Sequence, residues 1–152
     1  QNIHLRGAYA CCRSFGERMR SKAGGAIVLV SSIAGLRSSP LHSYGPAKAA
    51  IIHLTKTPAA EWGPSDVRVN CVCPGFTSTP ALARGVADGT LHKPILQAQS
   101  ALGRLVEPGE VADAIAFLAS PGASGITGAV LPVDAGHQAA SDWNAYGGLH
   151  ND

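Results

Sequence analysis

The stretch Ala26-Ile-Val-Leu-Val-Ser-Ser-Ile-Ala-Gly35 decides the fold of this chain. Its apolar run, 26–31, is bounded by turn signals, which is typical of a parallel strand buried on both faces. A helix is predicted over 43–62, and a second strand over 67–73. Strand, helix and strand at this spacing predict a parallel, right-handed βαβ unit.

Further elements extend this unit on both sides. Residues 2–21 carry an apolar stripe at spacings of three and four, which predicts a helix. Another helix is predicted from Glu107-Pro108, because proline suits the first helical position, and a short strand over 129–133. The segment 74–101 is predicted to be irregular, and a loop that long is usually functional or mobile. The tail 136–152 has no clear period.

Composition and charge exclude several functional classes. The 152 residues are 45% apolar and 14% charged, which suits a single domain with a sizeable core. The formal charge of +2 is too small to indicate binding to nucleic acid or to an anionic membrane. No apolar run approaches the roughly 20 residues of a membrane-spanning helix. We therefore expect neither nucleic acid nor membrane as a partner.

The cysteines and histidines do not predict a metal site. Cys71 and Cys73 alternate on a predicted strand and lack the second ligand pair that such sites need. The six histidines are scattered, and none forms an H-x-x-x-H pair. We expect buried or partly buried free thiols, as in a reducing compartment, and hence a cytoplasmic protein.

Two polar motifs follow the first predicted strand. Tyr44-Gly-Pro-Ala-Lys48 places a phenol and an ammonium on one helix face. An ammonium favours the phenolate form of a neighbouring tyrosine, so the pair can act as a general acid/base near neutral pH. The same spacing also occurs in ordinary helix-surface contacts. Ser31 and Ser32 stand at the carboxyl end of the strand, where open α/β sheets bind ligands.

Together these motifs resemble the classical short-chain dehydrogenase/reductase family. Val30–Gly35 is similar to its V-S-S-x-x-G motif, and Tyr44–Lys48 to its Y-x-x-x-K motif. Other matches occur in the family's order across nearly the whole chain. Gln1–Tyr9 resembles its N-x-x-x-x-G segment, and Val67–Gly75 resembles its R-V-N-x-x-x-P-G segment. The family's C-terminal pattern is matched by Leu102–Val111, Gly125–Gly128 and Val133–Gly136.

The resemblance implies an α/β fold, the C-terminal part of a doubly wound Rossmann-like parallel sheet with flanking helices. Residues 1–152 would then be a partial NAD(P)-binding domain that holds the catalytic half. The glycine-rich turn that binds the pyrophosphate is absent from these residues. The resemblance implies that four strands and their helices precede Gln1, and that the segment 74–101 covers cofactor and substrate.

The resemblance also implies roles for particular side chains. Tyr44 would exchange a proton with the substrate oxygen, and Lys48 would assist it and bind the nicotinamide ribose. Asn2 would hold a water that extends the proton relay, although it can also be a polar residue of a helix's first turn. A serine would hydrogen-bond the substrate oxygen. The x-x-Gly context gives Ser32 for that role, whereas the usual spacing of thirteen to the tyrosine gives Ser31; we favour Ser32.

The expected cofactor is NAD or NADP. Thr79 occupies the last position of a P-G-x-x-x-T pattern, where its hydroxyl can bind the nicotinamide carboxamide or a phosphate; alternatively it is a solvated loop residue. The cofactor-binding residues that the resemblance implies are Tyr44, Lys48, Pro74, Gly75, Phe76, Thr77 and Thr79.

The sequence therefore predicts an NAD(P)-dependent oxidoreductase that interconverts a secondary alcohol and a ketone. The alternative is a non-catalytic module that packs through helices 2–21 and 43–62, which form the main dimer interface in this family. The resemblance implies a homodimer or homotetramer for the complete protein. We expect the 152 residues alone to self-associate and to lack turnover, because strand 26–31 would expose an unpaired edge.

Overall fold

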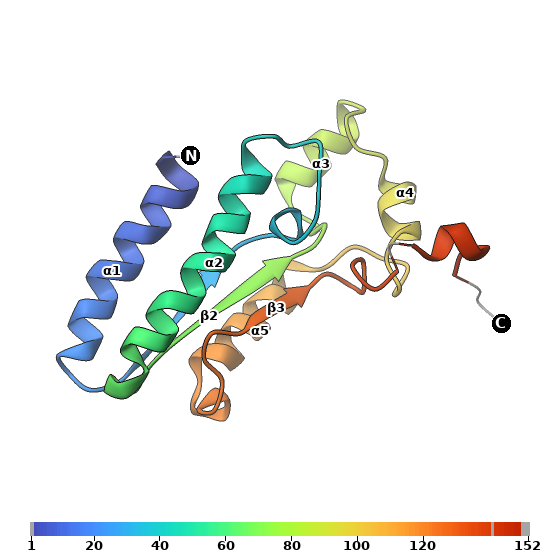
Figure 1. Cartoon of the computed structure of the whole chain (residues 1–152). Helices are drawn as coiled ribbons and strands as arrows, with labels where there is room; N and C mark the ends of the chain where they lie inside the picture. Colours follow the sequence, from blue (N-terminus) through green and yellow to red (C-terminus); the bar gives the residue numbers. More distant parts are fainter. Residues whose placement is uncertain (1, 141, 150–152) are drawn as a thin grey trace.

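Three parallel strands form the sheet of this protein in the computed structural model, which describes residues 2–140 and 142–149 (Figure 1). The strands are β1 (Gly25–Val30), β2 (Val67–Pro74) and β3 (Val130–Val133), in the order β1-β2-β3. The register pairs Gly25 with Val67 at one end of β1 and Val30 with Val72 at the other. The predicted α/β fold with a parallel sheet is confirmed.

Helices cover both faces of this sheet. α1 (Gly7–Arg20), which continues a π-helical turn at Asn2–Arg6, and α2 (Tyr44–Trp62) pack side by side on one face. α5 (Pro108–Ala119) packs against the strands on the other face and lies behind β3 in Figure 1. The helices predicted over 2–21, over 43–62 and from Glu107-Pro108 are thus confirmed. The last of them begins with a capping box between Glu107 and Glu110.

The core lies between β2 and the helices α1 and α2. Side chains on one face of β2 are fully buried, and they pack against Ile51 and Trp62 of α2. Gly16 allows α1 to approach closely, because a Cβ there would lie 2.2 Å from the Trp62 ring. All four cysteines are free; Cys11 is exposed, and the others are buried. The buried side chains of this β2 face are Val67, Val69, Cys71 and Cys73.

The segment after β2 is more regular than predicted. The expectation of an irregular stretch over 74–101 is wrong for two parts, α3 (Pro80–Ala87) and α4 (Lys93–Ala98). α3 forms because the Thr79 hydroxyl accepts a hydrogen bond from the Leu82 N–H at 3.3 Å and because proline fills the first helical position. Among the described residues, no helix is long and apolar enough to cross a membrane.

Candidate functional site

The carboxyl ends of the three strands lie at one edge of the sheet (Figure 1). The loop after β1 leads to α2, the loop after β2 leads to α3, and the loop after β3 begins at Asp134. This is the edge where ligands bind in open α/β sheets. Tyr44, Lys48 and both serines lie within or next to the first of these loops.

Ser31 and Ser32 have different environments. Ser31 is only 3% exposed, and its hydroxyl donates to the Lys48 carbonyl oxygen at 2.7 Å. Ser32 is half-buried; its hydroxyl oxygen accepts from the Ala34 N–H at 3.2 Å and caps the 3₁₀ turn Ile33–Gly35. A hydroxyl carries one hydrogen. The hydrogen of Ser31 is engaged with a backbone carbonyl, whereas Ser32 uses only an acceptor site.

Tyr44 and Lys48 lie one turn apart at the start of α2. The Lys48 Nζ atom is 5.4 Å from the centre of the Tyr44 ring and donates to the Val30 carbonyl oxygen at 3.1 Å. Because Lys48 is only 9% exposed, desolvation lowers the pKa of its ammonium. The last residue of β1 therefore holds the ammonium beside the phenol ring.

The N-terminal turn also reaches the tyrosine. The His4 ring meets the Tyr44 ring edge to face, with centroids 5.4 Å apart and an interplanar angle of 89°. The sequence offered no signal for this contact, since His4 occupies an unspecified position of the N-x-x-x-x-G motif. Asn2 begins the same turn, but its side chain lies outside the part of the structure that is described, so its role in a water relay stays a prediction.

The other predicted cofactor residues lie at the end of β2, which is Pro74, and in the loop that follows it. Gly75 packs so closely on the next loop that a Cβ there would lie 2.7 Å from the Asp134 Cα. The Thr77 hydroxyl donates to the Gly75 carbonyl oxygen at 3.0 Å. Thr79 caps α3 through its oxygen, which leaves its hydroxyl hydrogen for another acceptor. The sequence did not predict this cap, although a threonine before a proline is a known helix-start signal.

Arg37 and His137 are neighbours at this edge that no sequence motif indicated. The Arg37 guanidinium contacts the His137 ring nitrogen Nε2 although the two residues are 100 positions apart. The Phe76 ring lies edge-on to the same imidazole, with centroids 5.2 Å apart. The three side chains come from the loops after β1, β2 and β3, and only the fold brings them together.

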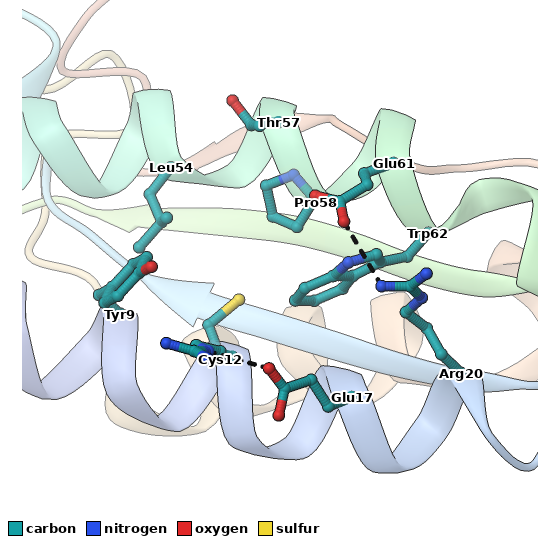
Figure 2. A pocket seen from close by; sticks show the side chains of 10 residues that line it. Tyr9, Cys12, Glu17, Arg20, Leu54, Thr57, Pro58, Glu61 and Trp62 are labelled. Carbon is teal, nitrogen blue, oxygen red and sulfur yellow. Dashed lines mark hydrogen bonds and ion pairs between the residues drawn. The ribbon is translucent and has the colours of Figure 1, made fainter.

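A separate groove of about 310 Å³ runs between α1 and α2 (Figure 2). Tyr9 and Leu54 line one end, and an ion pair between Arg20 and Glu61 at 3.4 Å links the two helices near the other. Leu54 lies ten residues beyond Tyr44, about 15 Å along the helix axis. The groove is therefore distinct from the carboxyl edge of the sheet.

The donors at the carboxyl edge fit a sugar diol of the kind that a nicotinamide ribose presents. An ammonium has three N–H groups, and Lys48 uses one of them on Val30. Among the described residues, the Tyr44 hydroxyl has no hydrogen-bond partner. Lys48 and Tyr44 thus keep unused donors on adjacent turns of α2.

Comparisons with known proteins agree with this geometry. A protein family described as enoyl-(acyl carrier protein) reductase matches residues 1–138. Galactitol 2-dehydrogenase of Rhizobium johnstonii (strain DSM 114642 / LMG 32736 / 3841) is 41% identical over 138 residues, which cover 89% of this chain and 53% of that protein. The chain thus spans about half the length of the curated relatives that it matches.

Solved structures show the same relationship. A structure named ribose-5-phosphate isomerase from Brucella melitensis 16M is 56% identical, covers 97% of this chain and 57% of its own, and has a TM-score of 0.94. The structure of ElxO with NADP bound is 33% identical, with coverages of 90% and 55% and a TM-score of 0.83. This chain belongs to the short-chain dehydrogenase/reductase family, whose cofactor is NAD or NADP.

Proposed function

We propose that the whole protein is an NAD(P)-dependent oxidoreductase that interconverts a secondary alcohol and a ketone. The observation that carries this proposal is the placement of Tyr44 and Lys48 at the carboxyl end of β1, with the ammonium fixed to the Val30 carbonyl and 5.4 Å from the phenol ring centre. The family's relatives support it, since galactitol 2-dehydrogenase is named for the oxidation of an alcohol.

The side chains divide the work of proton transfer. The bound nicotinamide supplies or accepts the hydride. The Tyr44 hydroxyl gives its proton to the substrate oxygen during reduction and takes it back during oxidation. The Lys48 ammonium stabilises negative charge on the phenol oxygen and offers its free N–H groups to the ribose. Asn2 extends the relay through a water molecule.

Ser32 is the serine that we assign to the substrate. Its hydroxyl hydrogen bonds to the substrate oxygen and stabilises the charge that develops there. The geometry supports this choice because the Ser31 hydroxyl already donates to Lys48. Phe76, Thr77 and Thr79 lie in the loop that we expect to face the nicotinamide. Of the two threonines, Thr79 keeps a free hydroxyl hydrogen.

A lysine pair on α2 tests the proposal. Lys48→Met removes the anchored ammonium, whereas Lys56→Met removes an exposed one from the same helix. In the whole protein, we expect reduction of small ketones that consumes NADH or NADPH, a loss of most of this activity in Lys48→Met, and little change in Lys56→Met. Failure of the whole protein to turn over any ketone or secondary alcohol with either cofactor would reject the proposed function.

The groove between α1 and α2 supports a second candidate function, a helix-packing module. Tyr9 and Phe15 of α1 are 52% and 58% exposed, so an apolar part of the helix is uncovered. In this family the two helices form the main dimer interface, and we propose a homodimer or homotetramer for the whole protein. Titration with NADP separates the candidates, since a pure packing module would associate without binding the cofactor.

A further inference from the structure

Three loops at the carboxyl edge of the sheet meet at His137. Arg37, from the loop after β1, contacts the ring nitrogen Nε2, and Phe76, from the loop after β2, packs edge-on against the ring. His137 itself follows β3. Arg37 lies five residues after Ser32 and seven before Tyr44, so this contact is part of the edge that holds the proposed catalytic side chains.

His137 holds the guanidinium without neutralising it. A guanidinium can only donate hydrogen bonds, so Nε2 must accept, and the ring is then neutral with its hydrogen on Nδ1. The ring is only 2% exposed, and both this burial and the Arg37 charge lower the pKa of His137. Asp134 opposes the shift, but its carboxylate oxygens accept from the Gly136 and Gln138 N–H groups at 3.0 and 2.9 Å.

Arg37 carries a charge that no described acidic side chain balances. Within the described part of the chain, the ion pairs join other arginines to glutamates on the surface. Residues 18–60 contain no aspartate or glutamate at all. Together with Lys48, Arg37 makes this part of the carboxyl edge positively charged. An exposed guanidinium fixed in this way is suited to planar, bidentate binding of a carboxylate or phosphate.

A hollow of about 420 Å³ adjoins Arg37 and offers room for such a group. It lies between the loop after β1 and the first turns of α2, and Gly45, the neighbour of Tyr44, is among its walls. Ser39 also lines it, and its hydroxyl oxygen is buried and has no hydrogen-bond partner among the residues that the structure describes. The hollow that Arg37 lines therefore has a second hydrogen-bond donor in its wall.

We propose that Arg37 binds an anionic group of the substrate, a carboxylate or a phosphate, and thereby selects charged ketones and alcohols over neutral ones. His137 is a positioning residue that holds the guanidinium in place. The inference rests on the proposed function, because it assigns a substrate class to the same site. The Ser39 hydroxyl completes the anion site as a hydrogen-bond donor.

Matched ketone pairs test this selection in the whole protein. One arm compares acetoacetate with its neutral methyl ester, and the other compares dihydroxyacetone phosphate with dihydroxyacetone. We expect the anionic member of one pair to have a kcat/KM about tenfold or more above its neutral partner, and that arm identifies the anion. Arg37→Gln should reduce this ratio by about tenfold, mainly by raising KM for the anion.

Control variants separate charge from structure. Arg18→Gln removes the same charge from the last turn of α1, at the other end of the sheet, and should keep the ratio. His137→Gln retains an acceptor for Arg37, whereas His137→Leu does not. We expect the glutamine variant to keep more of the ratio than the leucine variant, which a purely structural role for His137 would not predict.

A binding measurement gives an independent readout. Titration with inorganic phosphate or acetate, followed by the side-chain nitrogen resonances of His137, should shift these resonances in the wild type and not in Arg37→Gln. Equal turnover of charged and neutral ketones, or an unchanged ratio in Arg37→Gln, would overturn the inference and leave the proposed function intact. Failure of every ketone in the assay would reject the proposed function and this inference together.

Discussion

Polar side chains near the two ends of the sheet differ in how fully they are hydrogen-bonded. At the start of the central strand β2, the Arg68 guanidinium donates to the carbonyl oxygens of Leu118 at 2.7 Å and Ser120 at 3.0 Å. Asn70 is fully buried; its amide donates to the Ile126 carbonyl at 2.8 Å and accepts from a backbone N–H at 3.0 Å. These two side chains fasten the turn between α5 and β3 to the sheet.

At the carboxyl end, polar side chains keep unused hydrogen-bonding capacity. Lys48 uses one donor, the Tyr44 hydroxyl has no described partner, and Arg37 has no described carboxylate beside it. Buried polar groups cost free energy unless they are paired, so satisfied groups are what a stable fold requires. The polar groups at the start of β2 are hydrogen-bonded and support the structure. Those at the carboxyl end keep free hydrogen-bonding capacity, which suits them to bind a ligand.

Removing the Tyr44 hydroxyl is the strongest test of this contrast. In the whole protein, we expect Tyr44→Phe to lose nearly all turnover while cofactor binding changes little, because only the proposed proton carrier is removed. Steady-state kinetics and cofactor titration measure the two effects. A variant that kept more than about a tenth of the rate, a barrier change under about 1.4 kcal/mol, would rule out the assigned role.

Substitutions of the two adjacent serines test the same difference between a ligand-binding and a structural side chain. Ser32→Ala should slow turnover by roughly a hundredfold, as for loss of one donor to a developing oxyanion. Ser31→Ala should mainly lower the free energy of unfolding, by about 1–2 kcal/mol, because it removes a buried hydrogen bond to Lys48. Kinetics and urea unfolding of both variants decide the matter. If Ser31→Ala had the larger kinetic effect, spacing to the tyrosine would identify the catalytic serine instead.

Local sequence patterns predicted most of the fold but only part of the site. The βαβ unit was predictable because 26–31 and 67–73 are short apolar runs separated by a long helical pattern. The helices at Pro80 and Lys93 were missed because each is short; both have a proline near the first helical position, and the first also has a threonine cap. These signals were present in the sequence, but Thr79 was interpreted as a ligand-binding residue or a solvated loop residue and not as a helix cap.

Contacts between distant segments could not be predicted in the same way. Arg37 and His137 are 100 residues apart, and neither stands in a motif. The bonding of the two serines also depends on which backbone group each side chain meets, which alternation along a strand does not specify. The R-V-N motif contributed to the family resemblance. It did not predict that Arg68 and Asn70 hydrogen-bond to carbonyl oxygens between α5 and β3, because those contacts depend on the fold.

Removing a satisfied polar group should affect stability. Asn70→Ala leaves the Ile126 carbonyl and the Ala129 N–H without their side-chain partner, and we expect a loss of about 2 kcal/mol in the free energy of unfolding. Urea unfolding of the whole protein measures it. Thr90→Ala, at an exposed turn, is the control and should change stability by less than about 0.5 kcal/mol. If Asn70→Ala were as stable as this control, the structural role of the hydrogen-bonded side chains at the start of β2 would be contradicted.

The smallest expected effect is a pH dependence that belongs to the carboxyl edge alone. Burial and the charge of Arg37 lower the pKa of His137 from its ordinary value of 6.5, and Asp134 offsets this only in part. The unfolded chain therefore binds a proton at His137 more readily than the native protein does. Between the native and the unfolded pKa of His137, the free energy of unfolding rises with pH. The stability that depends on neutral His137 is fully present above about pH 6.5. It is lost as the pH falls below that value toward the pKa of His137 in the native protein. Each unit of pKa difference corresponds to about 1.4 kcal/mol.

Urea unfolding of the whole protein should give a lower free energy of unfolding at about pH 5 than at about pH 8. We expect His137→Gln to reduce this decrease, whereas His53→Gln, an exposed control on α2, should leave it unchanged. Identical pH dependence in the wild type and His137→Gln would show that the imidazole is not held neutral by its surroundings, and Arg37 would then lack the uncharged acceptor that leaves its own charge available.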